Sequence, residues 1–387
     1  GSGICCTAGG VQSMPECENP LWPCAMTGAA ACLAGFDGVT VVIHGSSGCY
    51  YYPATLLHAP LQGTFLLEND VIFGSEQRLH EVLDGLSGCG KKIAVVMTCV
   101  PAILGEDIRS MLRDYDVVLV DSPGFSGDME EGYKKALSAL APAIDNDTPG
   151  INIDGVSLFD PFSTGNVREI IRLFGNASVP VGTIFCSDQL EKVRHAAAFT
   201  VGTNRDFSSG IGELVGGTLG FEEIKATMTR VSSIFPYADP DPVFKEIERE
   251  DERIVRACDK FLRRFDPPQT LIFTGFSYAT FAAYTLKHYL DAEILYIGSR
   301  NEPGATSSSK IGYVQGFSRV KDLIRHHNPD LVIGSSFERS VDPKPAFVGL
   351  TPPVRGIVKL APHPVTGISG SLSFIENVLN ACMDRGK

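Results

Sequence analysis

Three cysteines of this 387-residue chain share a setting that could do chemistry. Cys24 follows a proline at the start of a predicted small-residue helix, Cys49 ends the run VVIHGSSGC, and Cys99 ends the run KIAVVMTC. A helix N-terminus favours a thiolate, and parallel sheets bind ligands at the carboxyl ends of their strands. Thiolates are the ligands that iron–sulfur clusters require. We therefore hypothesise that the three thiols converge on such a cluster. Buried structural thiols are the alternative that spacing alone leaves open.

The other cysteines offer no comparable pattern. None of the 11 cysteines forms a C-x-x-C pair, which excludes zinc ribbons, thioredoxin-type motifs and the bacterial ferredoxin run. Five lie within or beside predicted elements and are expected to be packing residues: Cys32, Cys89, Cys186, Cys258 and Cys382. We assign no role to Cys5, Cys6 and Cys17.

The elements that position the three cysteines alternate between strand and helix. We expect strands at 39–43, 92–99 and 117–120, with Cys49 carried by a small-residue turn after the first of them. The predicted helices are 24–36, 75–86, 101–112 and 128–140. Such alternation predicts a parallel sheet with both faces covered. We place this first domain at 4–150.

The alternation of predicted strands and helices continues along the rest of the chain. A middle domain at 151–266 has predicted strands GVSLF, VGTIF and AAFTVG, helices near 166–174 and 188–195 and one from Phe221, and a charged bridging helix at 239–264. A third domain at 267–387 has predicted strands TLIFTGF, EILYIG, DLVIGSS and GIVKL, and a closing helix at 372–382. The sequence therefore predicts an α/β protein of three Rossmann-like, doubly wound parallel-sheet domains.

Composition narrows the possible partners. The chain has 33 basic and 45 acidic residues, a net charge of −12, which argues against a general nucleic-acid surface and against binding to anionic membranes. No apolar run reaches the roughly 18 residues that span a bilayer, and no signal-peptide pattern opens the sequence. We expect a cytoplasmic protein.

Two other motifs predict different chemistry. Gly85, Gly90 and Lys91 have phosphate-loop spacing, but the next residue is a lysine and the loop precedes a strand, so we reject a nucleotide site there. Ser277 lies at a strand–turn–helix elbow, and Asp330 and His363 follow in the chain order of a serine hydrolase. A helix-capping role for this serine is the simpler interpretation.

Longer runs resemble a known family. CENPLWPCAMTGAAACLAGFDGVTVVIHGSSGCYY, ENDVIFG, VVMTCVPAILGEDI and SPGFSG occur in the order, and at the separations, of the component 1 family of nitrogenase-like enzymes. PDLVIGSSFE and the closing HPVTGISGSLSFIENVLN are similar to the third domain of that family. The resemblance covers nearly the whole chain.

The resemblance implies a function and partners. Cys24, Cys49 and Cys99 match the cysteines that ligate an iron–sulfur cluster at the subunit interface of a dimer, and a separate ATP-hydrolysing reductase supplies electrons. A cubane cluster takes four protein ligands, so three thiols from one chain imply that a second copy or a close paralogue, or another side chain, contributes the rest. We expect a 4Fe-4S or larger cluster and no nucleic-acid or membrane partner.

Departures from true nitrogenase guide the choice of substrate. Gly202 to Asn204 stand where the cofactor-anchoring cysteine is expected, so a molybdenum–iron cofactor held as in nitrogenase is not expected. The IHG-xx-GC and TC-x-x-x-x-GED patterns are similar to the homodimeric Ni-sirohydrochlorin a,c-diamide reductive cyclase of coenzyme F430 biosynthesis. A tetrapyrrole is our preferred substrate. The alternatives are a scaffold that assembles or holds a metal cofactor, a relative with another substrate, the Ser277 hydrolase, and a cluster-free binding protein.

Further residues are candidates for the site. His363 and Gly367 lie in the turn where the family's third domain faces its cavity, although an exposed loop is equally compatible. Glu68 and Asp70 could add an oxygen ligand or simply face solvent. We expect His44 to stabilise its turn by hydrogen bonding rather than to bind metal.

Overall fold

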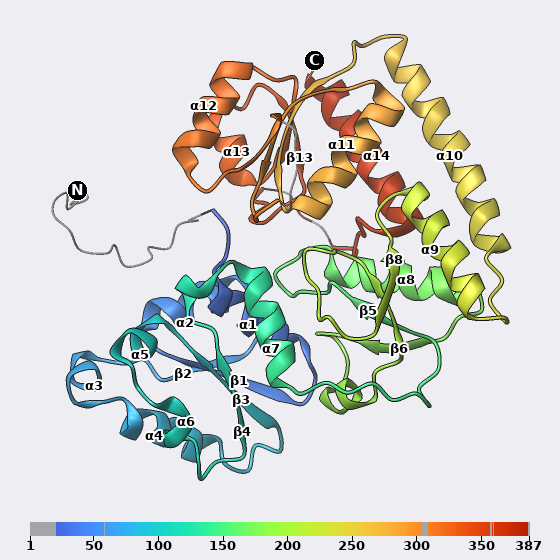
Figure 1. The fold of residues 1–387 in the computed structure, drawn as a ribbon. Helices are drawn as coiled ribbons and strands as arrows, with labels where there is room; N and C mark the ends of the chain where they lie inside the picture. The colour runs from blue at the N-terminus through green and yellow to red at the C-terminus, as the bar shows by residue number, and fades with distance from the viewer. Residues whose placement is uncertain (1–20, 58, 304–308, 357, 359, 386–387) are drawn as a thin grey trace.

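A computed structural model describes residues 21–385, apart from 58, 304–308, 357 and 359. Within these residues the chain forms three parallel sheets in succession, each covered by helices (Figure 1). This arrangement confirms the predicted α/β fold class. Cys5, Cys6 and Cys17 lie outside the described residues. No helix in the described part of the chain is long and apolar enough to cross a membrane.

The first sheet has the strand order β2-β1-β3-β4. Its strands are β1 (Val39–His44), β2 (Leu61–Gly63), β3 (Lys92–Met97) and β4 (Val117–Asp121). Its helices are α1 (Ala25–Gly35), α2 (Ser47–Leu57), α3 (Glu68–Phe73), α4 (Glu76–Leu86), α5 (Cys99–Leu104), α6 (Ile108–Met111) and α7 (Met129–Ala139). Side chains of α1 and α7 form the core on one face of the sheet, and those of α4 and α6 form it on the other.

Two glycines let α1 and α7 approach closely. A Cβ atom added at Gly28 would lie 1.9 Å from the carbonyl oxygen of Met129, and one added at Gly132 would lie 1.8 Å from that of Ala25. No real side chain fits at such distances. The contact fixes the first residues of α1 against the start of α7, beside the SPGFSG loop.

Two predictions about the first sheet need correction, namely the turn that carries Cys49 and the single helix at 101–112. Cys49 lies in the first turn of helix α2, not in a turn before it. Gly48 and Pro53 both lower helix propensity and hid this helix from the sequence pattern. Glu68 and Asp70 lie in the short helix α3. The helix predicted at 101–112 is divided into α5 and α6 at Gly105, which has a φ of 70°.

The middle sheet has the order β6-β5-β7-β8, with β5 (Ile151–Asp154), β6 (Val181–Ile184), β7 (Phe199–Gly202) and β8 (Glu213–Gly217). Its helical elements are α8 (Ser163–Asn176), the 3-10 helix η2 (Leu190–His195), α9 (Phe221–Ile234) and α10 (Asp241–Leu262). The strand predicted at GVSLF is wrong, because INID just before it forms β5. Asn152 and Asp154 are buried in this central strand, where side-chain hydrogen bonds satisfy them. Because both residues are polar, the sequence pattern does not predict a buried strand here.

The third sheet has the order β11-β10-β9-β12-β13. Its strands are β9 (Gln269–Thr274), β10 (Glu293–Ser299), β11 (Ile311–Tyr313), β12 (Leu331–Gly334) and β13 (Ala346–Gly349). Its helices are α11 (Phe276–Leu290), α12 (Phe317–His327), α13 (Ser336–Val341) and α14 (Gly367–Arg385). The last strand is AFVG rather than the predicted GIVKL, in which Val358 and Leu360 are exposed.

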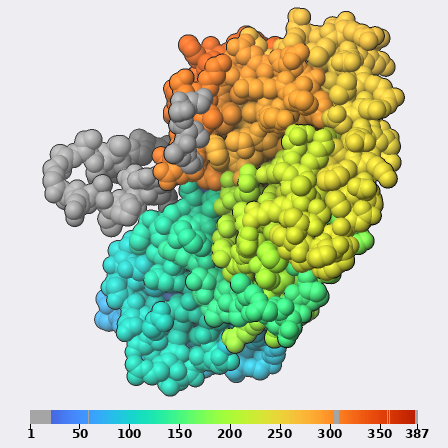
Figure 2. Space-filling model, turned by 45° about the vertical axis from the view of Figure 1, so that its right-hand side comes forward, coloured from blue at the N-terminus to red at the C-terminus, as the bar shows by residue number. Residues whose placement is uncertain are grey.

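The three sheet regions are packed together rather than separated (Figure 2). Phe159, Phe185 and Phe207 of the middle region belong to the core of the first sheet. A single apolar cluster joins the middle and third regions, and α14 packs against α8 and α9 as well as β13. Because the cores are shared, the domain limits at 150 and 266 stay predictions.

Candidate metal centre and adjoining cleft

Cys24 occupies the N-cap position of α1, at the helix N-terminus where the sequence predicts it. Its backbone forms an isolated antiparallel bridge with Asp128, and its Sγ lies 3.6 Å from Thr27 Oγ1. The α1–α7 contact described above therefore holds this sulfur beside the SPGFSG loop. The side chain is half-buried.

Cys49 and Cys99 follow the carboxyl ends of two neighbouring strands, β1 and β3. Cys99 is the first residue of α5, and Cys49 lies in the first turn of α2, where Ser46 Oγ donates to its Sγ over 3.8 Å. Both side chains are half-buried. The loop after β4 brings Gly124, whose N–H donates to Cys99 Sγ over 3.1 Å.

The structure brings the three thiols together. A Cβ added at Gly124 would lie 3.1 Å from Cys24 Sγ and 3.1 Å from Cys99 Sγ, so both sulfurs border one small space. Cys49 lines the same cleft as Cys24 and Gly124. Burial raises the pKa of Cys49, and electrostatic interaction with Cys99 and Cys24 raises it further. Cys24 and Cys99 therefore border one space and Cys49 lines the cleft beside it, while their role as ligands stays a prediction.

This donor set suits a metal cluster better than a single ion. Within the described residues, no three His, Cys, Asp or Glu side chains are close enough to hold one metal ion. In a cubane cluster each thiolate binds a different iron atom, so the sulfurs stand further apart. Each sulfur also has a polar contact from a different residue, and hydrogen bonds to the sulfurs tune such clusters. The residues present fit an iron–sulfur cluster.

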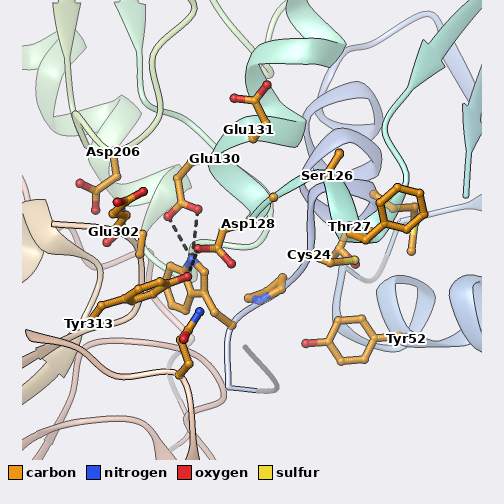
Figure 3. Close-up of a pocket in the computed structure, with 18 of the residues that line it drawn as sticks. Cys24, Thr27, Tyr52, Ser126, Asp128, Glu130, Glu131, Asp206, Glu302 and Tyr313 are labelled. Atoms are coloured by element: carbon orange, nitrogen blue, oxygen red, sulfur yellow. Dashed lines mark hydrogen bonds between the residues drawn. The ribbon is translucent and has the colours of Figure 1, made fainter. Parts of the chain in front are cut away.

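A cleft of about 1080 Å³ adjoins the thiols. Cys24, Cys49 and Tyr52 are among its lining residues, and Figure 3 shows Cys24 and Tyr52 on one side of it. The start of α7, the segment after β7 and the segment after β10 also line it. Ligand pockets typically have about 300–1,000 Å³, so this cleft can hold a large organic or metal-containing molecule.

The lining of the cleft is acidic. Five carboxylate residues line the cleft, namely Asp128, Glu130, Glu131, Asp206 and Glu302. Its one Lys or Arg among the described lining residues is Arg205, which is paired with Glu223 at 2.8 Å. The cleft therefore favours occupants that carry positive charge, or it holds protons on some of its acids.

Glu130 is an acid of the cleft whose pKa is raised. Desolvation within the cleft, reinforced by the nearby charge of Asp206, raises the pKa of Glu130 to about 8. Trp22 Nε1 donates to both of its carboxylate oxygens, at 3.0 and 3.1 Å. Desolvation also raises the pKa of Asp206, which accepts hydrogen bonds from the backbone and hydroxyl of Ser277. Glu130 is consequently a neutral acid at pH 7.

Several other predicted residues lie away from the cleft. Glu68 is exposed, and Asp70 accepts a hydrogen bond from the N–H of Leu67, capping α3. His363 is exposed, and Gly367 starts α14 with its N–H bound to Thr218 O. Neither His363 nor Gly367 is among the residues that line the cleft.

His44 makes the hydrogen bond that the sequence predicts. It is fully buried at the end of β1, and its Nε2 lies 3.0 Å from Ser75 Oγ, which in turn donates to Glu106. Burial lowers the pKa of His44 to about 4, so the ring is neutral at pH 7.

The hydrolase residues are not assembled. Ser277 Oγ donates to Asp206 at 2.7 Å, and Ser277 follows the carboxyl end of β9. Asp330 precedes β12, which runs parallel to β9, so it lies at the opposite end of the sheet. Asp330 there accepts a hydrogen bond from the N–H of Gln269.

Sequence reasoning missed the acids of the cleft. Glu130 looks like an ordinary acid in the first turn of a helix. Asp206 and Glu302 follow the carboxyl ends of β7 and β10, and the rule that ligands bind at such ends could have found them. Both Thr203 and Asn204, where the cofactor cysteine of nitrogenase is expected, are buried just before Arg205 and Asp206.

Comparisons with known proteins agree with this fold and site. A family model described as nitrogenase component 1 type oxidoreductase matches residues 24–383. The nitrogenase molybdenum-iron protein beta chain of Bradyrhizobium diazoefficiens is 29% identical over 188 residues, 40% of this chain and 35% of the relative. The nitrogenase iron-molybdenum cofactor biosynthesis protein NifE of Clostridium pasteurianum is 23% identical over 309 residues, 72% of this chain and 68% of the relative. The solved structure titled Nitrogenase Cp1 at pH 6.5 has a TM-score of 0.80 at 17% identity, over 99% of this chain and 95% of that one.

The fold and site define a three-sheet α/β protein whose thiols gather at the carboxyl edge of its first sheet. The chain belongs to the nitrogenase component 1 type oxidoreductase family. This confirms the family that the sequence motifs predict. The match to the beta chain covers about a third of that relative. Relatives include both a nitrogenase chain and a cofactor biosynthesis protein, so membership is compatible with a catalytic or a cofactor-assembling role.

Proposed function

We propose that this chain is a nitrogenase-like catalytic component that binds an iron–sulfur cluster through Cys24, Cys49 and Cys99. It receives low-potential electrons from an ATP-hydrolysing iron–sulfur reductase and reduces a substrate bound in the adjoining cleft. The observation that carries this proposal is the convergence of three half-buried thiols at the edge of a large cleft. Such a protein works in the cytoplasm.

A dimer completes the cluster in this proposal. Three thiols leave a cubane one ligand short, and the half-buried sulfurs reach the surface, where a second copy or a close paralogue can approach them. The elements that carry Cys49 and Cys99, together with α3, expose an unusual number of large apolar side chains. We call this set the apolar rim: Tyr51, Leu67, Ile72, Phe73, Ile103 and Leu104. Exposed apolar patches of this kind mark protein–protein interfaces.

The cysteines, Gly124 and Glu130 have different roles in this proposal. The three thiolates hold the cluster, which supplies electrons when bound. The N–H of Gly124 stabilises the charge on Cys99 Sγ, as hydrogen bonds to cluster sulfurs do. Glu130 retains a proton at pH 7 and can release it to a neighbouring group in the cleft, which suits a reduction that consumes protons.

A tetrapyrrole is our preferred substrate class, with Ni-sirohydrochlorin a,c-diamide as the specific candidate. The size of the cleft supports a macrocyclic ligand. Charged lining carboxylates would repel the carboxylates of such a ring, and the protonated Glu130 reduces that repulsion.

A second candidate is a scaffold that holds a metal cofactor during its assembly. The similarity to NifE, which extends over 72% of this chain, favours it, and the acidic lining suits a metal-bearing ligand. A scaffold would bind its cofactor and release it chemically unchanged.

Turnover with a purified reductase distinguishes the two roles. The anaerobic protein is mixed with a nitrogenase Fe-protein-like reductase, MgATP and Ni-sirohydrochlorin a,c-diamide, and the pigment is followed by absorption and mass spectrometry. We expect a reduced pigment that depends on both MgATP and the reductase. Recovery of unchanged pigment, together with transfer of a metal cofactor to an acceptor protein, would favour the scaffold.

A further inference from the structure

Two cysteines outside the candidate metal centre face each other across the seam between the first and middle sheets. Cys32 lies in α1 and Cys186 follows β6, yet their Sγ atoms are 3.0 Å apart. Both side chains are completely buried, and both belong to the shared core described above. Neither is needed for the proposed function.

The chain uses two unusual backbone features to hold this contact. Cys186 has a φ of 61°, in the left-handed region that residues with side chains rarely occupy. Gly35, one turn after Cys32 in α1, allows the backbone of Cys186 to approach, since a Cβ added there would lie 2.1 Å from the carbonyl oxygen of Cys186. Strain of this kind persists only where the surroundings enforce it. The juxtaposition of the two thiols is therefore strongly specified by the fold.

Other side chains beside the two cysteines also make contacts between the first and middle sheet regions. Tyr133 of α7 donates from its hydroxyl to Asp154 of β5, so a second side-chain contact crosses between the two regions. Burial raises the pKa of Tyr133, and electrostatic interaction with Asp154, Cys186 and Cys32 raises it further. Burial, strengthened by the proximity of Cys32, raises the pKa of Cys186.

We propose that Cys32 and Cys186 are a disulfide-forming pair, which small peroxides oxidise to a covalent link between the first and middle regions. With hydrogen peroxide, one thiol gives up its proton and its sulfur bonds to one peroxide oxygen. The O–O bond breaks, and the hydroxide that leaves takes up the proton, giving a sulfenic acid and one water molecule. The second sulfur displaces the hydroxyl group of that sulfenic acid as a second water molecule. The two thiols lose two electrons and two hydrogens to the peroxide, and one S–S bond forms.

The geometry favours this product over the usual competitors. The sulfurs must close by only about 1 Å to reach the disulfide bond length of roughly 2.05 Å. Complete burial excludes larger thiols such as glutathione. A sulfenic acid on either cysteine therefore reacts with the other cysteine of the pair. Because the link joins positions 154 residues apart, it constrains the unfolded chain and raises the melting temperature.

Peroxide titration of the intact, anaerobically purified protein tests this proposal. After oxidation, free thiols are blocked with iodoacetamide under denaturing conditions, and peptides are mapped by mass spectrometry without reduction. Exposed Cys89 serves as an internal gauge of oxidant exposure. We expect a Cys32–Cys186 cross-linked peptide and a melting temperature that rises by a few degrees and returns after dithiothreitol treatment.

Matched variants separate the pair from the other cysteines. Cys89→Ala should form the cross-link as the parent does, while Cys32→Ala and Cys186→Ala should lose both the cross-link and the rise in melting temperature. If Cys32 and Cys186 of the parent protein remain free for alkylation after Cys89 is fully oxidised, the proposal is wrong. Cross-linking of either residue to a different cysteine would overturn it equally. The cross-linked peptide is the readout that does not depend on whether the cluster or the proposed activity is present.

Discussion

Gly124 and Cys99 are joined by a hydrogen bond from a backbone N–H to a sulfur, 3.1 Å long. The same glycine leaves a space bordered by the sulfurs of Cys24 and Cys99. Gly124 of the SPGFSG loop therefore donates a hydrogen bond to one thiol, and its lack of a side chain leaves room for the sulfurs of two. We therefore count Gly124 as part of the candidate metal centre.

Gly124→Ala should weaken cluster binding. The added methyl carbon would lie 3.1 Å from both sulfurs, closer than ordinary contact, so the thiols would move apart. Changes beside a metal's ligands typically cost roughly 10-fold or more in metal affinity. Iron content after anaerobic reconstitution measures the effect. Gly85→Ala, where an added carbon meets no atom within 4 Å, is the control and should retain the parent's iron. Equal iron in the two variants would contradict this role for Gly124.

The raised pKa of Glu130 predicts a stability that depends on pH. The folded protein keeps this proton up to about pH 8, whereas the unfolded chain releases it near the ordinary value of 4.5. The folded state therefore binds more protons between these values, and the free energy of unfolding should fall as pH rises through this window.

Glu130→Gln should remove this part of the pH dependence, because the amide has no proton to lose. Urea unfolding at several pH values between 5 and 8 measures it. Glu131→Gln, at the exposed neighbouring position in α7, is the matched control and should keep the slope of the parent protein. A slope in Glu130→Gln that matches the control would show that Glu130 does not have the raised pKa.

The apolar rim predicts the surface of the dimer. Phe73 is 84% exposed in the single chain, so the change Phe73→Ser should cost the chain itself little. Loss of an aromatic anchor from an interface should weaken dimerisation by roughly 10-fold or more. Sedimentation velocity over a range of concentrations measures this. Leu214→Ser on β8, away from the rim, is the control. A dimer unaffected by Phe73→Ser would place the interface elsewhere.

Ser277 should not react as a hydrolase nucleophile. Its hydroxyl is donated to Asp206, and Asp330 lies at the other end of the sheet. A fluorophosphonate probe should therefore leave Ser277 unlabelled under conditions that label a known serine hydrolase. Stoichiometric labelling at Ser277 would instead revive the hydrolase interpretation.

The sequence predicts features that depend on neighbouring residues, and misses those that depend on packing between regions. Cys24, Cys49 and Cys99 could be identified because each lies at an element boundary on one sheet. Glu130, Asp206 and Glu302 come from three different regions and meet only after the sheets pack together. The proximity of Cys32 and Cys186 has the same origin.

Local errors have local causes. Strand β5 was missed because Asn152 and Asp154 are polar, and their burial depends on partners far along the chain. Helix α2 was missed because Gly48 and Pro53 oppose a helix that the surrounding structure nevertheless stabilises. In both cases tertiary contacts outweigh the intrinsic preference of the residues.

Iron and sulfide content of the anaerobically isolated protein, measured with its visible absorption, tests the central claim most directly. We predict a brown protein with about four or eight iron atoms and as many sulfides per dimer. Cys49→Ala should lose the chromophore and most of the iron, while Cys89→Ala, which changes an exposed thiol outside the centre, should keep both. A colourless, iron-free parent protein, or a Cys49→Ala variant that retains as much iron as Cys89→Ala, would contradict the assignment of the cluster to these thiols.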